Sequence, residues 1–214
     1  MNAGRFFGKL WLRSVAFNAL LFGMKRRALE AYEQIVGIDP QDKIARATVG
    51  NMRMELGDAA GAIDAFNGLV ALDPAHADSW FNLGYIHDQR DELAEAERCF
   101  RRCIELNANH DRALYGLGLV LIRTGRLHDA VAALKQNVKL QPFSPYGYYQ
   151  LAMTQHHLGD SGDAWRTYEQ LKTFEPRYAA TLKRDLEQTR PHAVVQLRTD
   201  SDSLSAKEAL AAST

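Results

Sequence analysis

Residues 77–110 read ADSWFNLGYIHDQRDELAEAERCFRRCIELNANH, and this stretch decides the fold. The spacing of Trp80, Gly84, Ala96 and Phe100 within it recurs along the sequence with a period of 34 residues. Repeats of about 20 to 50 residues are typical of chains that stack one supersecondary unit several times. Five consecutive units follow one another without an insertion, and they begin at Lys9, Lys43, Ala77, Asp111 and Pro145.

Three columns of the repeat agree between the units. The Gly84 column holds only glycine or alanine, so a small residue always lies where the two helices of a unit approach most closely. The Ala96 column holds alanine in every unit, and the column four residues later holds a bulky apolar side chain. The members are Ala16, Gly50, Gly84, Gly118 and Ala152; then Ala28, Ala62, Ala96, Ala130 and Ala164; then Tyr32, Phe66, Phe100, Leu134 and Tyr168.

Turn residues mark the ends of the predicted helices. Between the two helices of a unit, four units have glycine and the third has Asp91, as expected for a helix C-cap with a left-handed backbone. Four units end in proline, which lacks the N–H that a continuing helix would need. The turn glycines are Gly23, Gly57, Gly125 and Gly159, and the prolines are Pro40, Pro74, Pro142 and Pro176.

In its length and its columns this unit resembles the tetratricopeptide repeat (TPR), a helix-turn-helix module. The resemblance implies an all-α fold, a right-handed α–α superhelix in which each unit packs mainly on its neighbours. The implied units of this solenoid are 9–42, 43–76, 77–110, 111–144 and 145–178.

The segments outside the units differ in character. Residues 1–8 are expected to lead into the first unit. Leu182 and Leu186, set among charged residues, predict a more polar helix over 179–190 that caps the last unit. Residues 191–214 are rich in Ser, Thr, Ala and Asp with little periodicity, so most of this tail is expected to be disordered.

Bulk composition bounds the function. With 46% hydrophobic and 24% charged residues the chain resembles an ordinary soluble protein, and no run of about 20 apolar residues predicts a transmembrane span. The formal net charge of zero argues against nucleic-acid binding, which needs a basic face. Cys99 and Cys103, four apart in one predicted helix, are interpreted as a reduced structural pair. We therefore expect a cytoplasmic protein, with contact at the periphery of a membrane as a further option.

The first 27 residues contain six basic residues and no acidic one, interleaved with an unusually apolar helix. Three interpretations stay open. The apolar side chains pack on the second helix and the next unit, or they dock on an anionic membrane or a membrane protein, or the segment is a cleavable targeting signal. The third is disfavoured because the repeat phase already begins at Lys9. The basic residues are Arg5, Lys9, Arg13, Lys25, Arg26 and Arg27.

Catalytic motifs are not found in the sequence. Gly116 and Gly118 fall inside a predicted helix rather than in a phosphate-binding loop, and no serine lies in a nucleophile elbow. His156 and His157 are adjacent and project about 100° apart on a helix, so they do not chelate one metal. We expect no enzyme activity, no metal and no cofactor.

The TPR resemblance implies that certain first-helix positions of each unit face a concave groove. In this sequence those positions give an aromatic strip flanked by amides and cations, which suits the anchoring of a peptide. The alternative is that the tyrosines only cover the groove walls. The predicted binding residues are Asn51, Asp78, Phe81, Asn82, Tyr85, Arg112, Tyr115, Arg123, Tyr146, Tyr149, Gln150 and Met153.

One TPR subclass clamps the C-terminal carboxylate of chaperones with Lys and Asn in one unit, Asn in the next, and Lys and Arg in the third. The matching positions here lack two of the cationic donors, so this function is disfavoured. Those positions are Ala47, Asn51, Asn82, Arg112 and Gly116.

The sequence therefore predicts a non-enzymatic adaptor or scaffold that holds an extended peptide or a helix of a partner protein in the groove. Two alternatives are a membrane-surface assembly factor that docks through residues 1–27 and a self-associating homo-oligomeric scaffold. The groove could also be filled by the chain's own tail, through Val194, Val195 and Leu197.

Overall fold

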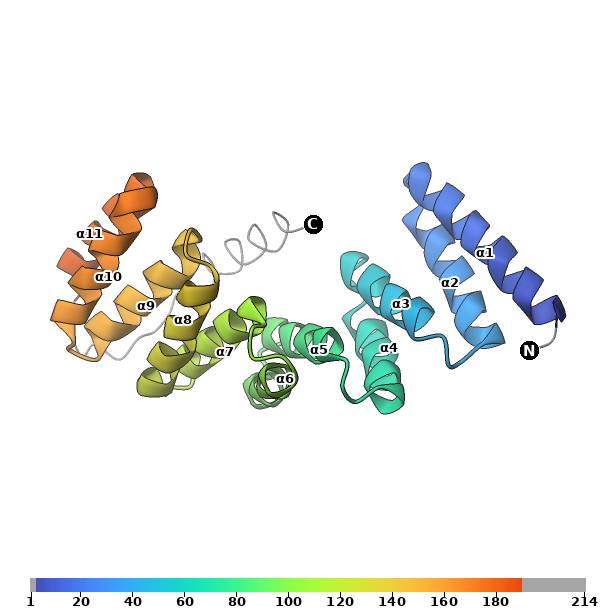
Figure 1. Cartoon of the computed structure of the whole chain (residues 1–214), viewed down its shortest axis with the longest axis horizontal. Helices are drawn as coiled ribbons and strands as arrows, with labels where there is room; N and C mark the ends of the chain where they lie inside the picture. Colours follow the sequence, from blue (N-terminus) through green and yellow to red (C-terminus); the bar gives the residue numbers. More distant parts are fainter. Residues whose placement is uncertain (1–2, 190–214) are drawn as a thin grey trace. The chain divides into compact units, whose positions relative to one another are not determined.

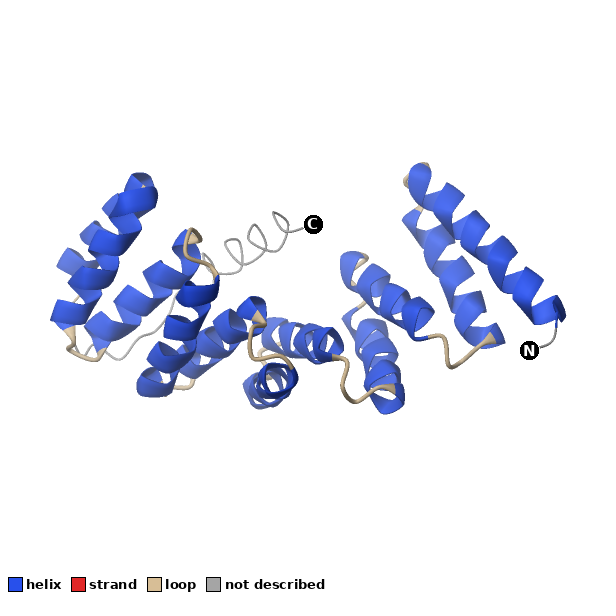
Figure 2. Ribbon diagram, in the orientation of Figure 1, coloured by secondary structure: helices blue, strands red, loops and turns tan. Residues whose placement is uncertain are grey.

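The computed structural model describes residues 3–189, and within this range all regular structure is α-helical (Figures 1 and 2). Eleven helices are present in these residues. The described residues divide into two compact parts, one that ends at Ala108 and one that begins at Asn109. The expected all-α architecture of paired helices is confirmed.

In the N-terminal part each odd-numbered helix packs against the helix that follows it (Figure 1). The helices are α1 (Ala3–Leu21), α2 (Lys25–Ile38), α3 (Lys43–Glu55), α4 (Ala59–Leu72), α5 (Ala77–Gln89) and α6 (Leu93–Leu106). The C-terminal part repeats the same pairing and adds one further helix. Its helices are α7 (Asp111–Arg123), α8 (Leu127–Leu140), α9 (Pro145–His157), α10 (Ser161–Phe174) and α11 (Pro176–Gln188).

The turns inside the pairs have the predicted left-handed backbone. Asp91 has φ 61°, and the four turn glycines have φ between 70° and 86°. Glycine has no Cβ and adopts such angles without strain, whereas Asp is one of the few other residues that tolerates them. The helices α3, α5, α7 and α9 begin at the first residues of the repeat units read from the sequence.

In α3, α5 and α7 the side chain of the residue before the helix caps it, whereas Ser144 before α9 makes no such side-chain hydrogen bond. Asp42 Oδ1 accepts a hydrogen bond from the Ala45 N–H at 3.0 Å. His76 Nδ1 accepts from Ser79 N–H at 3.2 Å, and His110 Nδ1 accepts from Ala113 N–H at 3.1 Å. Each acceptor satisfies one of the backbone donors that a helix start leaves without an intrahelical partner.

The predicted core columns are buried. The alanine of the Ala96 column is fully buried in all five units, and Phe66, Phe100 and Leu134 from the bulky column are at most 2% exposed. Tyr32 and Tyr168 fill the same column in the first and last units and are less deeply buried.

Both ends depart from the bounds read from the sequence. Helix α1 begins at Ala3, so residues 3–8 belong to the helix and are not a separate lead-in. Helix α11 begins at Pro176, three residues before the expected start, because a proline at the first helical position has a suitable φ and needs no hydrogen-bond acceptor. Glu175 alone joins α10 to α11. Ala179, Leu182 and Leu186 are buried, so α11 caps the last unit as expected. The predicted disordered tail, 191–214, lies outside the described residues.

Candidate partner-binding surface

Two predicted binding residues of the N-terminal part meet between neighbouring first helices. Asn82 Nδ2 on α5 donates a hydrogen bond to Asn51 Oδ1 on α3 at 3.1 Å. Asn51 is exposed and Asn82 is half-buried. Within residues 3–189, the Asn51 amide NH₂ and the Asn82 Oδ1 form no other side-chain hydrogen bond. The pair therefore presents both a donor and an acceptor at the surface.

Ile44 lies two turns before Asn51 on the same face of α3, because side chains seven residues apart nearly coincide around a helix. It is 71% exposed. Ile44 is not among the predicted binding residues, although its place in the repeat is one of the positions used to predict them. It occupies the second position of its repeat unit, as Asp78 and Arg112 do in theirs.

The aromatic residues of α5 divide between core and surface. Phe81 is only 4% exposed, and its ring lies 6.0 Å from Phe100 and 6.5 Å from Tyr85. Phe81 therefore packs in the core rather than at the surface. Tyr85 is half-buried, and burial, followed by the nearby Asp88 carboxylate, raises the pKa of its hydroxyl. Asp78, at the start of α5, is exposed.

In the C-terminal part, two predicted binding tyrosines of α9 contact α11. The rings of Tyr146 and Tyr149 each lie 5.7 Å from the ring of Tyr178, in edge-to-face arrangements. Tyr149 Oη also donates a hydrogen bond to Asp185 Oδ2 at 2.7 Å. At the other end of α11, His156 Nε2 lies 2.7 Å from the Thr189 carbonyl oxygen, which makes this nitrogen the hydrogen-bond donor. These side chains hold α11 against α9.

The remaining predicted residues of the C-terminal part have different environments. Gln150 is buried in α9, and Met153 packs against the apolar cluster between α9, α10 and α11. On α7, Arg112 is exposed, whereas Tyr115 and Arg123 are half-buried.

The apolar N-terminal helix packs only in part. Leu12, Ala16 and Ala19 are buried against α2. For these three residues the structure agrees with the interpretation that the apolar side chains of this segment pack on the second helix. Most of the larger apolar side chains of α1 and the following turn remain exposed. Among the described residues, no helix combines the length and hydropathy that crossing a membrane requires.

Comparison with protein-family models identifies the class of protein. Residues 55–175 match the model of the middle TPR-like domain of cilia and flagella-associated protein 70, and residues 23–77 match a tetratricopeptide repeat model. The chain therefore belongs to the TPR family. No curated protein sequence matches it.

Solved structures agree on the fold. A crystal structure of MamA is similar with a TM-score of 0.73 and 22% identity, covering 81% of this chain and 94% of MamA. The MamA segment from residue 41 to the end, from Desulfovibrio magneticus RS-1, has a TM-score of 0.71 and 19% identity over 79% of this chain and 96% of that one. YrrB, described as a TPR protein with an unusual peptide-binding site, has a TM-score of 0.68 and 20% identity over 79% and 88%.

Proposed function

We propose that this protein is a non-enzymatic adaptor that binds an extended segment of a partner protein along α3 and α5. The observation that carries the proposal is the amide pair Asn51–Asn82, which bridges two consecutive first helices at the surface. An extended peptide carries one N–H donor and one carbonyl acceptor per residue, and both need partners when the peptide is bound. The Asn51 amide NH₂ would donate to a peptide carbonyl, and Asn82 Oδ1 would accept from a peptide N–H.

Neighbouring side chains add selectivity to this backbone recognition. Ile44 offers an exposed apolar contact on the same face of α3, and Tyr85 offers a half-buried ring one turn after Asn82. Asp78 places a carboxylate at the start of α5. We therefore expect the bound segment to carry one apolar side chain and to avoid acidic ones near Asp78.

The C-terminal part contributes less to this function. Tyr146 and Tyr149 contact α11 and are half-buried, so only part of each side chain is accessible to a partner. On α7, we expect Arg112 and Arg123 to bind a carboxylate group of the partner, with Tyr115 on the same helix. Peptide recognition by a TPR protein has a parallel in YrrB, whose described peptide-binding site supports this class of function.

The experiment selects peptides from a display library on the full chain and measures the affinity of the winners for variants. Asn51→Ala combined with Asn82→Ala should weaken binding about thirtyfold, since the two lost hydrogen bonds cost about 1 kcal/mol each. Gln34→Ala is the matched control, because Gln34 is an exposed amide on α2. Selection of no peptide, or equal binding by the double variant and Gln34→Ala, would disprove the proposal.

A further inference from the structure

We propose that the exposed apolar face of α1 docks on an anionic lipid surface. This face consists of apolar side chains from α1 and the turn after it, each between 44% and 72% exposed. Its members are Phe6, Phe7, Leu10, Trp11, Phe17, Leu20, Leu21 and Phe22. The inference is independent of peptide binding on α3 and α5.

Helical spacing puts the most prominent of these side chains on one side. Phe7, Leu10, Phe17 and Leu21 are separated by three, seven and four residues, intervals that return to one face of an α-helix. Leu12, Ala16 and Ala19 lie on the opposite face and are buried. Helix α1 is therefore apolar on both faces, and only one of them is covered by α2.

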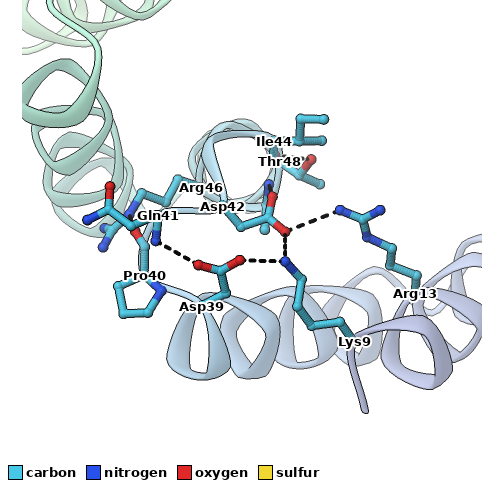
Figure 3. A network of polar contacts seen from close by, with 10 residues as sticks. Lys9, Arg13, Asp39, Pro40, Gln41, Asp42, Ile44, Arg46 and Thr48 are labelled. Atoms are coloured by element: carbon cyan, nitrogen blue, oxygen red, sulfur yellow. Dashed lines mark hydrogen bonds and ion pairs between the residues drawn. The ribbon is translucent and has the colours of Figure 1, made fainter. Parts of the chain in front are cut away.

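Polar contacts hold α1 in its observed orientation. Lys9 Nζ lies 2.6 Å from Asp39 Oδ2 and 2.7 Å from Asp42 Oδ2, and Arg13 Nη2 lies 3.2 Å from Asp42 Oδ2 (Figure 3). These ion pairs tie α1 to the end of α2 and to the residue that caps α3. Rotation of α1 to bury its outer apolar face would break them.

The outer face does not fit another helical repeat. The third position of every later unit holds a small buried residue: Ala45, Ser79, Ala113 or Gly147. At Gly147 an added Cβ would lie 2.2 Å from Asn137 Oδ1 of α8, so the second helix of the preceding unit packs directly on this position. The first unit has Trp11 here, 66% exposed. If a second copy stacked on this face as a further repeat, its last helices would clash with the Trp11 indole. A lipid surface has no such fixed helix, and the indole can insert into it.

The charge that accompanies the face is positive. Arg26 and Arg27 are exposed at the start of α2, directly after the turn that exposes Phe22 and Met24. Neither arginine forms an ion pair with any residue in the range 3–189. The sequence has no acidic residue before Glu30. Exposed aromatic side chains beside unpaired arginines suit the headgroup region of an anionic bilayer, where the rings enter the interface and the cations meet the headgroups.

The first experiment is flotation of the full chain with vesicles of phosphatidylcholine, alone or mixed with equal parts of phosphatidylserine. We expect binding to the mixed vesicles that weakens as salt screens the charges. Phe7→Gln combined with Phe17→Gln should reduce binding about tenfold or more, and Arg26→Gln with Arg27→Gln should reduce it about tenfold. Matched controls are Phe143→Gln, an exposed phenylalanine of the C-terminal part, and Lys135→Gln with Lys139→Gln on α8.

A second readout reports the position of Trp11 without altering the face. The chain has three tryptophans, so Trp80→Phe with Trp165→Phe leaves Trp11 as the only indole. Its emission should shift to shorter wavelength with the mixed vesicles and not with phosphatidylcholine alone.

Three outcomes would overturn the proposal. One is failure of the intact chain to float with the mixed vesicles, and another is flotation that both double variants retain. The third is a dimer in light scattering that dissociates in the Phe7→Gln/Phe17→Gln variant, which would make a second copy the occupant of the face.

Discussion

A methyl group on Gly84 would lie 2.7 Å from Cδ1 of Phe100, much closer than van der Waals contact allows. Gly84 is on α5 and Phe100 is on α6, so this contact sets the closest approach of the two helices of the third unit. The first and last units have alanine in the glycine column, and there the facing side chain is a tyrosine that is less deeply buried. The same close relationship holds for the pairs Gly50–Phe66 and Gly118–Leu134.

Gly84→Ala should destabilise the protein. Alanine favours a helix over glycine by about 1 kcal/mol, but the new methyl group must displace a buried ring, and such overpacking costs about 1 to 3 kcal/mol. The expected net change is a lower free energy of unfolding in urea. Gly37→Ala is the control, because nothing lies within 4 Å of its added Cβ, and it should leave stability unchanged or raise it. A Gly84→Ala variant as stable as Gly37→Ala would show that the ring moves freely.

Asp42 both caps α3 and binds Lys9, and two substitutions separate these roles. Asp42→Asn keeps an acceptor for the Ala45 N–H but removes the charge, whereas Asp42→Ala removes both. The Ala variant should lose about 1 kcal/mol more than the Asn variant in urea unfolding, the typical value of an N-cap. Equal losses would mean that the cap contributes nothing measurable.

The ion pairs of α1 should also give stability a defined pH dependence. The hydrogen bond from Lys9 lowers the pKa of Asp39. Burial alone would raise the pKa of Asp42, but hydrogen bonds from Lys9 and the Ala45 N–H outweigh it and the pKa is lowered. The hydrogen bonds to Asp39 and Asp42 raise the pKa of Lys9.

For carboxyl groups with lowered pKa, the stabilisation is present above the ordinary value of 3.8 and is lost as pH falls through the folded-state pKa. For Lys9 it is present below 10.5 and is lost as pH rises through the raised pKa. The difference in unfolding free energy between the natural chain and Asp42→Asn should therefore be constant near neutral pH and shrink in strong acid. A difference that grows on acidification would contradict this assignment.

The two cysteines should be unreactive in the folded protein. Cys99 and Cys103 form no disulfide and are fully buried in α6, and burial raises the pKa of the Cys99 thiol to about 11. The thiolate is the reactive form, so little of it exists at pH 8 and none of it is accessible. A chromogenic disulfide reagent should label both thiols in urea and neither in buffer. Rapid labelling of the folded chain would mean that α6 opens locally.

The sequence predicted the buried positions of the paired helices well, because these positions recur every 34 residues. It did not predict which faces of the end helices are covered. Phe17 and Leu21 look like core residues in the sequence, yet they are exposed because no element of the described structure packs on them. Tyr149 has the family's groove position, yet α11 lies against it.

The binding residues were harder to predict than the fold. Asn51 and Asn82 meet between neighbouring first helices, whereas Phe81, at the position before Asn82, faces Phe100 and is buried. The position of a residue in the TPR unit predicts only approximately which side of the helix it lies on. The side chain that it faces then decides whether the residue is buried or exposed. Whether these residues bind a partner stays a prediction.

Helix α11 should be loosened by removing one hydroxyl group. Tyr149→Phe keeps the ring contact with Tyr178 but deletes the donor to Asp185, and loss of such a hydrogen bond costs about 1 kcal/mol or more when a charged acceptor is left behind. Backbone amides of α11 should therefore exchange with deuterium about fivefold faster, with little change in α7 and α8.

Tyr146→Phe is the matched control for this prediction. Its ring also contacts Tyr178, but its hydroxyl forms no hydrogen bond with residues 3–189. This variant should leave exchange in α11 unchanged. Equal acceleration in both variants would mean that ring packing alone holds α11. Faster exchange in Tyr149→Phe alone would show that a single polar contact helps to keep α11 on α9, and a partner that competes for Asp185 would then have a defined route to the tyrosines beneath.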